Sequence, residues 1–222
     1  FLMFRPRAVV SGDFDWGEEL DGKVIVATVD CTGHGVPGAF MSIIGSTMLT
    51  KVVKFYQTSV PNEILQRLDE EIRSTLQQDK TDNQYGMDLS VCVIENLDNQ
   101  QYKITYAGAK RPLYYIEQGD NQVFILKGDR RSIGGVQNEN IPFTNQEVVL
   151  KKGSSLFIGS DGFVDQNNAE RVKLGESKFK YLLSQNYDKP MKQLQKELEN
   201  FLDAYQKGTV QRDDILLMGV RL

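Results

Sequence analysis

The chain has 222 residues, of which 40% are hydrophobic and 25% are charged, and its net charge is −4. These values are ordinary for a globular protein that buries a sizeable core. No block of lysine and arginine occurs, which disfavours a nucleic-acid partner. The two cysteines lie in apolar stretches and predict a reducing compartment rather than a disulfide framework. No signal peptide is evident, and no uninterrupted apolar run approaches the roughly 20 residues that a membrane span needs.

The hydrophobic pattern predicts strands and helices in a definite order. The apolar run at 23–30 predicts a buried strand, and glycines and proline in 31–38 break it. Helical spacing begins at 39, and a second helix is predicted from Pro61, a favoured first-turn residue, to Leu76. A polar loop at 77–86 precedes the remaining elements. Strands are predicted at 88–95, 101–108, 112–117, 121–127, 147–153, 154–162 and 214–222, and a third helix at 189–205.

The order of these elements predicts the fold class. Short connections between consecutive strands favour antiparallel pairing. Two helices together and one alone among runs of strands indicate a layered α+β fold. Neither a repeat nor a convincing linker interrupts the pattern, so we expect one domain over 1–222.

Four aspartates share one placement in this pattern, at the end of a predicted strand and beside glycine or another acid. They are Asp13, Asp30, Asp161 and Asp213. A sheet can bring such ends together, and clustered carboxylates repel one another unless cations hold them. Oxygen ligands without cysteine or histidine pairs favour Mg²⁺ or Mn²⁺, and two such ions form a clamp for attack of water on phosphorus. The alternative interpretation is that each aspartate only forms a turn.

Seven motifs occur in an order that resembles SpoIIE-like (RsbU-type) bacterial serine/threonine phosphatases, a branch of the PPM or protein phosphatase 2C superfamily. The resemblance runs from Phe4 to Leu222, and its motifs are "RPRAVVSGDFDW", "DCTGHGVPGAFMS", "GMDLSVCVIE", "YAGAKRPLYYI", "KGDRRSIGG", "SDGFVDQ" and "QRDDILLMGV". It implies an αββα four-layer sandwich, in which two antiparallel β-sheets are flanked by helices. It also implies a centre of two Mn²⁺ or Mg²⁺ ions at one end of the sandwich.

The resemblance also implies roles for particular residues. Asp30 would bridge both ions, and the backbone carbonyl of Cys31 would bind one of them. Asp161 and Asp213 would hold the other ion. Asp13 matches the acid of the family's "GD" motif and would belong to the metal site directly or through water. Asp30 and Asp13 are therefore the expected catalytic residues.

The function implied by the resemblance is hydrolysis of phosphoserine or phosphothreonine on a protein by a metal-activated water. The substrate would be a phosphorylated protein, for which a STAS-domain anti-sigma antagonist in partner switching is the candidate. An upstream sensor or linker module, a homodimer, and a cytoplasmic location, including the cytoplasmic part of a membrane-anchored sensor, are further expectations. Two alternatives stay open: a catalytically silent binding module with the same fold, and a phosphohydrolase of small molecules.

The stretch "VDCTGHGVPGAFMS" contains other groups that resemble catalytic residues. Cys31 does not match a thiolate phosphatase, because that chemistry needs arginine six positions later and Pro37 stands there. The glycines lack the Gly-Lys-Ser/Thr of a Walker loop. His34, the only histidine, is either a general acid or a residue of the turn, and the turn is favoured. The glycines are expected to turn the backbone tightly and start the helix.

Several other charged residues each allow two interpretations. Asp88 either helps to hold a further metal ion or forms a turn, and Asp15 either adds an acid to the site or faces solvent. Asp214 is expected to support the site rather than to ligate. One of Arg5 and Arg7 either binds the substrate phosphate or is only a surface charge. Arg130 and Arg131 either dock an acidic or phosphorylated partner or only keep their loop soluble.

Overall fold

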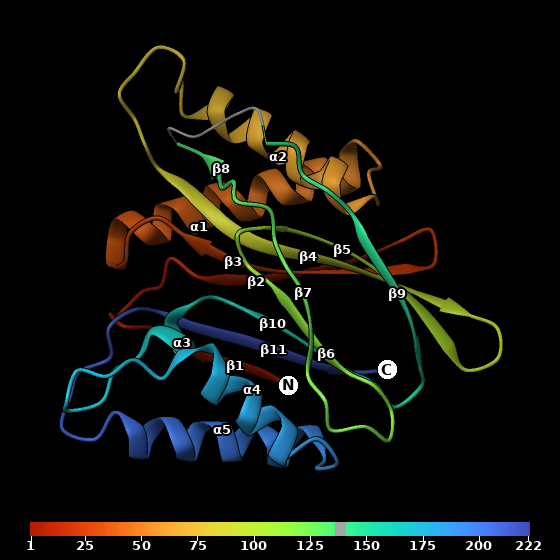
Figure 1. Cartoon of the computed structure of the whole chain (residues 1–222). Helices are drawn as coiled ribbons and strands as arrows, with labels where there is room; N and C mark the ends of the chain where they lie inside the picture. The colour runs from red at the N-terminus through yellow and green to blue at the C-terminus, as the bar shows by residue number, and fades with distance from the viewer. Residues whose placement is uncertain (136–140) are drawn as a thin grey trace.

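The computed structural model describes residues 1–135 and 141–222, and its core is two antiparallel β-sheets packed face to face (Figure 1). One sheet has the strand order β1-β11-β10-β6-β7, and the other has the order β2-β3-β4-β5-β9 with β8 paired to β4. The strands of the first sheet are β1 (Leu2–Arg5), β11 (Ile215–Arg221), β10 (Ser155–Gly159), β6 (Leu113–Ile116) and β7 (Phe124–Leu126). Those of the second are β2 (Phe14–Leu20), β3 (Lys23–Cys31), β4 (Gly86–Leu97), β5 (Gln101–Ala109), β9 (Gln146–Lys151) and β8 (Ile133–Gly134).

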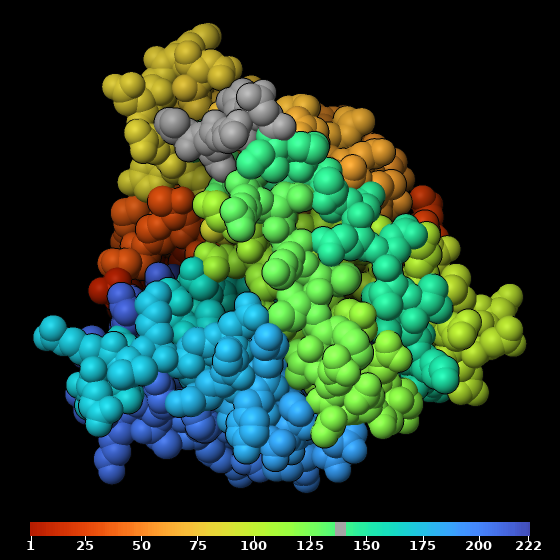
Figure 2. Space-filling view, viewed as in Figure 1, coloured from red at the N-terminus to blue at the C-terminus, as the bar shows by residue number. Residues whose placement is uncertain are grey.

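Helices form the two outer layers of the molecule (Figure 1). The six-stranded sheet is covered by α1 (Gly35–Thr50), by the π-helical segment η1 (Lys51–Phe55) and by α2 (Pro61–Thr75). The five-stranded sheet is covered by α3 (Gly162–Asp165), α4 (Gly175–Gln185) and α5 (Met191–Tyr205). The predicted α+β four-layer sandwich is therefore confirmed. In the space-filling view the N-terminal helical segments and the C-terminal helices lie on opposite sides of the molecule (Figure 2).

The packing of α2 shows why the sequence forms these layers. Pro61 begins the helix at a position where the missing N–H costs nothing. The side chains of Ile64, Leu65, Leu68 and Ile72 follow at helical spacing and are fully buried against the sheet. Burial of each such side chain stabilises the fold by about 1.5–3 kcal/mol. A similar stripe on α5 packs on the other sheet, so each sheet has its own helical cover.

A third apolar cluster fills the space between the two sheets. It contains Cys92, Ile104 and Tyr106 from the six-stranded sheet and Leu156 and Ile158 from the five-stranded sheet. All five side chains are at most 3% exposed, so the sheets are held together by a continuous core. This core fixes the relative position of the strand ends at the edge of the sandwich.

The structure corrects several sequence-based expectations about the elements. Val9 and Val10, read as the end of a strand before Asp13, lie in bends, and Val9 is 99% exposed. Asp13 therefore precedes a strand, β2, rather than following one. The sequence pattern does not predict β1, β2, β8, α3 or α4. α4 is short and has only two fully buried side chains, Phe179 and Leu183, so its sequence signal is weak.

Helix α1 and its continuation η1 differ from the other helices in being apolar on most sides. Among the described residues, Gly35–Phe55 is a helical stretch of 21 residues that is long and apolar enough to cross a membrane by length and composition. This corrects the expectation that no segment reaches that length, because interrupting serine and threonine residues lower the hydropathy only slightly. Core helices pass the same test, and this one packs Met41 and Leu49 into the core beneath it.

Candidate active site

The aspartates singled out in the sequence come from separate segments that meet at one end of the sandwich. Asp30 is the penultimate residue of β3, Asp161 lies two residues after β10, and Asp213 lies two residues before β11. All three line one open pocket of about 360 Å³. Asp13 lies between β1 and β2 and is 4% exposed, beneath the same cluster. The predicted convergence of these distant positions is thus observed.

The register between β3 and β4 adds a fourth carboxylate to the pocket wall. Asp30 faces Asp88 across the two strands, and both line the pocket. Like charges placed directly opposite on paired strands repel each other. This pairing therefore requires a cation nearby, whether from the protein or from solution.

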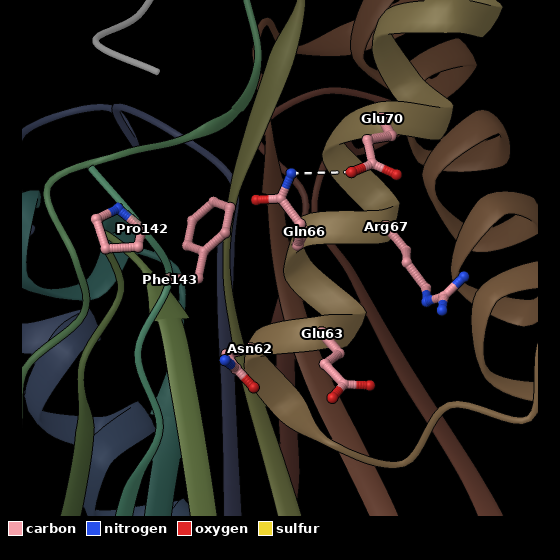
Figure 3. A pocket seen from close by; sticks show the side chains of 7 residues that line it. All are labelled: Asn62, Glu63, Gln66, Arg67, Glu70, Pro142 and Phe143. Carbon is pink, nitrogen blue, oxygen red and sulfur yellow. Dashed lines mark hydrogen bonds between the residues drawn. The ribbon is translucent and has the colours of Figure 1, made fainter. Parts of the chain in front are cut away.

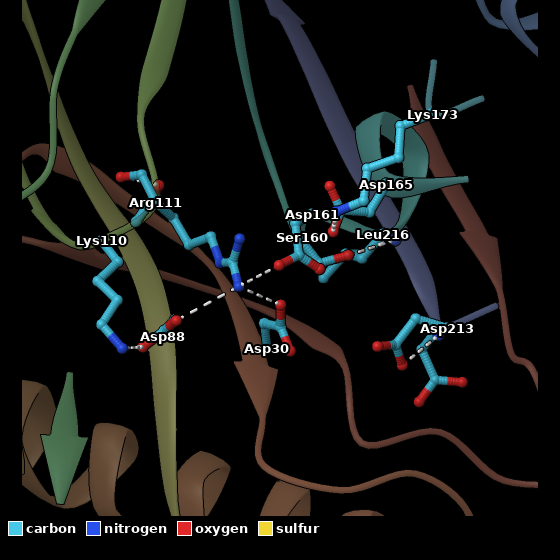
Figure 4. Close-up of polar contacts among 12 residues, drawn as sticks. Asp30, Asp88, Lys110, Arg111, Ser160, Asp161, Asp165, Lys173, Asp213 and Leu216 are labelled. Atoms are coloured by element: carbon cyan, nitrogen blue, oxygen red, sulfur yellow. Dashed lines mark hydrogen bonds and ion pairs between the residues drawn. The ribbon is translucent and has the colours of Figure 1, made fainter. Parts of the chain in front are cut away.

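Arg111 supplies such a cation in the structure. Its Nη2 atom lies 2.9 Å from Oδ2 of Asp30, 2.7 Å from Oδ2 of Asp161 and 3.3 Å from Oδ2 of Asp88 (Figure 4). Its neighbour Lys110 reaches only Asp88, with Nζ 3.6 Å from Oδ1. One guanidinium nitrogen therefore joins three carboxylates from two strands and a loop.

Electrostatic repulsion remains in spite of this cation. Burial and repulsion by Asp214, Asp213 and Asp161 raise the pKa of Asp13 to about 7, although a hydrogen bond with the Ser160 side chain acts in the other direction. Burial and the Asp13 carboxylate raise the pKa of Asp30 well above its ordinary value, while Arg111 opposes that rise. The Oδ2 atom of Asp13 is buried and has no hydrogen-bond partner among the described residues. The cluster thus has more negative charge than its protein cations neutralise.

These observations test whether divalent cations suit the residues present. The donors are carboxylate oxygens, which Mg²⁺ and Mn²⁺ prefer. A buried oxygen without a partner and a shared guanidinium both mark a place for positive charge, so the donor set fits. Within residues 1–135 and 141–222, however, no three acidic, histidine or cysteine side chains are close enough together to hold one ion. The physical reason is that Arg111 occupies the space between Asp30 and Asp161, while the exposed Asp213 stands apart from them (Figure 4).

Asp214 has a different task from its neighbour Asp213. Its two carboxylate oxygens accept the backbone N–H groups of Arg7 and Gly12 at 2.7 and 2.8 Å, and the side chain is buried. These bonds tie the segment that leads into Asp13 to the start of β11. The expected supporting role of Asp214 agrees with these contacts.

The glycines after Asp30 shape the turn from β3 into α1. Gly33 and Gly35 have φ of +90° and +65°, which favour glycine. Gly38 packs against the backbone of Gly33 and Gly12 with no room for a Cβ atom. His34 is the exposed N-cap residue of α1, makes no side-chain cap and lines the pocket. The expected tight turn is observed, but α1 begins at Gly35, earlier than the predicted start at 39.

The thiol of Cys31 lies in the same turn and is buried. Burial and the Asp30 carboxylate raise its pKa well above the ordinary value. A protonated thiol is a poor nucleophile. This agrees with the rejection of thiolate chemistry. The backbone carbonyl of Cys31 is left as the group of this residue that is expected to bind a metal ion.

The structure gives the remaining charged residues from the sequence analysis mainly structural or surface positions. Asp15 is exposed on β2, and Arg5 forms a surface ion pair with Asp203 at 2.5 Å. Arg131 is 5% exposed and forms an ion pair with the buried Asp69, so it is not available to dock a partner. The docking interpretation of Arg131 is therefore wrong. Charge on a loop looked solvent-exposed in the sequence, but here the loop folds inward onto α2.

A second hollow of about 470 Å³ lies between α2 and the segment before β9 (Figure 3). Its lining is Asn62, Glu63, Gln66, Arg67, Glu70, Pro142 and Phe143. It contains none of the clustered aspartates, and its charged residues, Glu63, Arg67 and Glu70, are exposed. The acidic cluster therefore lies in the smaller pocket, and this hollow shares no lining residue with it.

Sequence reasoning missed Arg111, although it lies within the motif "YAGAKRPLYYI". The available signal was a basic pair, Lys110 and Arg111, directly after a strand at 101–109 in a protein whose acids gather at strand ends. Opposite charges at the same edge of a sheet predict an ion pair. Ser132, which also lines the pocket, carries no such signal.

Comparison with known proteins defines the class of this fold. It is the PP2C phosphatase fold: the chain superposes on the SiaA-PP2C domain of Pseudomonas aeruginosa with a TM-score of 0.87 and 31% identity, covering 100% of this chain and 85% of that one. The RsbU and RsbW domains of a Mycobacterium tuberculosis protein match with a TM-score of 0.75 and 18% identity, over 99% of this chain and 58% of that one. The phosphatase domain and regulatory fragment of SpoIIE from Bacillus subtilis match with a TM-score of 0.73 and 19% identity, over 99% of this chain and 60% of that one.

The family follows from the sequence match. The family model for stage II sporulation protein E (SpoIIE) matches residues 20–222. A search of curated protein sequences gave no match. The chain belongs to the SpoIIE family of PPM phosphatases, which confirms the resemblance seen in the sequence.

Proposed function

We propose that this chain is a divalent-metal-dependent protein serine/threonine phosphatase that hydrolyses phosphoserine or phosphothreonine. The observation that carries the proposal is the convergence of carboxylates from β3, β4 and the loops after β10 and before β11 on one polar pocket, with Asp13 from the loop before β2 buried near them. Membership of a phosphatase family supports it. So does RsbX, a protein of the same fold whose structure was determined in complex with magnesium.

The residues that would hold the cations are Asp30, Asp161, Asp213 and Asp13, with the backbone carbonyl of Cys31. When bound, a pair of Mn²⁺ or Mg²⁺ ions supplies Lewis-acid activation of water and neutralises charge on the phosphoryl group. The chain's own contribution is to hold the acids at fixed positions, through the β3–β4 register and the Asp214 bonds. The raised pKa of Asp13 lets this carboxyl hold a proton near neutral pH when no cation is near.

One observation favours a second candidate function, a catalytically silent binding module with the phosphatase fold. Arg111 pairs with Asp30 and Asp161 directly, so a cation of the protein already balances part of the negative charge of the central acids. A silent module would keep this arrangement permanently. The phosphatase interpretation instead requires that Arg111 can leave it.

The substitution Asp30→Asn tests the proposal. We expect at least about a 100-fold loss of Mn²⁺-dependent hydrolysis of p-nitrophenyl phosphate and of a phosphoserine peptide, because the central ligand of the charge-stabilising ions is lost. Asp15→Asn, an exposed aspartate on β2, is the matched control and should keep wild-type turnover. Circular dichroism should show both variants folded.

The results separate the candidate functions. Equal rates in wild type with Mn²⁺ and with EDTA, both at background, would favour the silent module. Near-wild-type turnover of Asp30→Asn would refute the assigned centre. A strong preference for nucleotides over the phosphopeptide would favour a phosphohydrolase of small molecules.

We further propose a signalling context with protein partners. The substrate class is a phosphorylated regulatory protein, of which a phosphorylated STAS-domain anti-sigma antagonist is the candidate, in the cytoplasm and under control of a linked sensor module or of homodimerisation. Release of phosphate from such a protein with Mn²⁺ present is the direct assay. Turnover of the phosphopeptide but not of the phosphorylated STAS protein would reject this substrate.

A further inference from the structure

The position of Arg111 is built into the backbone around it. The carbonyl of Arg111 accepts hydrogen bonds from the hydroxyls of Ser90, at 3.1 Å, and of Tyr106, both of which are fully buried. Lys110 has φ of +60°, an unfavourable conformation for a residue with a side chain, and its N–H donates to the carbonyl of Asp129 at 2.9 Å. The turn is thus held from three directions, and it delivers the guanidinium into the pocket.

The contacts of this guanidinium coincide with the place expected for a cation. Nη2 lies between Oδ2 of Asp30, on β3 of the six-stranded sheet, and Oδ2 of Asp161, in the loop that follows β10 of the five-stranded sheet. The side chain of Arg111 is only 16% exposed, and its Nε atom is buried without a hydrogen-bond partner among the described residues. The guanidinium therefore interacts mainly with the carboxylates, although its Nε–H donor is left without an acceptor.

We propose that Arg111 is the resident counter-ion of the acidic cluster and that it competes with divalent cations for Asp30 and Asp161. In the metal-free protein the guanidinium balances part of the charge of these carboxylates and so stabilises the fold. A divalent cation held by these two carboxylates would compete with Nη2 of Arg111, so binding it would cost the existing ion pairs. Arg111 thereby sets the metal affinity of the centre. The inference rests on the metal centre of the proposed function.

The neighbouring residue Lys110 provides a matched control for overall charge. It follows the same strand and carries the same charge, but its Nζ approaches only Asp88 and its side chain is half exposed. Arg111→Gln and Lys110→Gln remove one positive charge each from the same pocket. An effect of net charge alone would strengthen metal binding in both variants, whereas competition for Asp30 and Asp161 would strengthen it mainly in the first.

Isothermal titration of the metal-free protein with Mn²⁺ tests the competition. We expect Arg111→Gln to bind Mn²⁺ at least about tenfold more tightly than wild type, which corresponds to about 1.4 kcal/mol. Lys110→Gln should change the Kd much less. A second readout is thermal unfolding, because Arg111→Gln should lower the Tm in EDTA while the difference from wild type disappears at saturating Mn²⁺.

Arg111→Ala gives an independent test that does not depend on the stability of the first variant. It leaves a cavity of guanidinium shape, so added methylguanidinium should weaken Mn²⁺ binding to this variant while leaving wild type unchanged. Unchanged or weaker Mn²⁺ binding in Arg111→Gln, or equal gains in both Gln variants, would overturn the competition while the metal centre stands. Absence of Mn²⁺ binding in wild type and in every variant would overturn the metal centre as well.

Discussion

The buried ion pair between Asp69 and Arg131 provides a sharp test of how the fold supports the pocket. Asp69 lies on α2 and is 2% exposed. Its Oδ2 accepts from Nη2 of Arg131 at 2.5 Å and from Nε of Arg73 at 3.1 Å, and its Oδ1 accepts the backbone N–H of Gly134 at 2.6 Å. One carboxylate thus joins α2 to β8 and to the segment that carries Ser132 into the pocket.

The substitution Asp69→Ala should be strongly destabilising. Removal of one partner leaves a buried guanidinium with no counter-charge from Asp69, and such losses cost about 3–5 kcal/mol. Arg131 keeps its hydrogen bond to the carbonyl of Ile141 and its contact with the ring of Phe143, which places the expected loss toward the lower end. For a chain of this length, a loss of that size lowers the Tm by roughly 6–20 °C.

Chemical denaturation in urea, with a double-mutant cycle, measures this effect. Asp69→Ala combined with Arg131→Met removes both charges and should recover at least about 1 kcal/mol relative to the sum of the single losses. Glu70→Ala is the control, because Glu70 is exposed on the same helix and should change stability by no more than about 0.5 kcal/mol. A loss below about 1 kcal/mol for Asp69→Ala would refute the reasoning, since it would mean that water replaces the carboxylate.

Two further predictions concern the pocket itself. The pKa of Asp13 is raised to about 7, so the folded protein binds more protons than the unfolded chain between about pH 4 and 7. The free energy of unfolding in EDTA should therefore fall as pH rises through that window. Asp13→Asn should make this fall shallower and raise the free energy of unfolding at pH 8 by up to about 4 kcal/mol. Urea denaturation at a series of pH values measures this, with Asp15→Asn as control, and an unchanged slope in Asp13→Asn would contradict it. Gly38→Ala should destabilise the fold by about 1–3 kcal/mol. The added Cβ would collide with the carbonyl of Gly33 and crowd the Cα of Gly12. Neither group can move without shifting the turn that follows Asp30. Gly17→Ala, where a Cβ meets only ordinary contacts, is the control in thermal unfolding, and equal Tm values for the two variants would show that the turn is soft.

The layered fold was predictable because its main elements have long and regular patterns. The stripe from Ile64 to Leu76 predicted α2 almost to the residue, and the third predicted helix, 189–205, matches α5 closely. β2 was missed because one of its faces is exposed and charged, so that only Trp16 among its side chains is buried. Short elements such as β8 depend on pairing with β4, which no local pattern reveals.

The acids of the site were predictable, but their counter-ion was not. Asp30, Asp161 and Asp213 are recognisable because each follows or precedes a strongly apolar strand. The pairing of Asp30 with Asp88 depends on the register between β3 and β4, and the reach of Arg111 depends on a turn held by Tyr106. Arg131 shows the converse error, because a charge on a loop was read as exposed while α2 supplied a buried partner.

These positions together explain why the pocket is both necessary and costly to the fold. The sheet cores hold the strand ends in place, so the carboxylates cannot separate to relieve their repulsion. The remaining means of relief are to hold protons, as the raised pKa of Asp13 indicates, to pair with Arg111, or to bind cations from solution. The first two act in the protein by itself, and the third must displace them. The affinity of the proposed centre for divalent cations would therefore be the difference between strong attraction and the loss of an existing ion pair. We therefore expect the proposed site to respond to substitution of a residue that is not a ligand, namely Arg111.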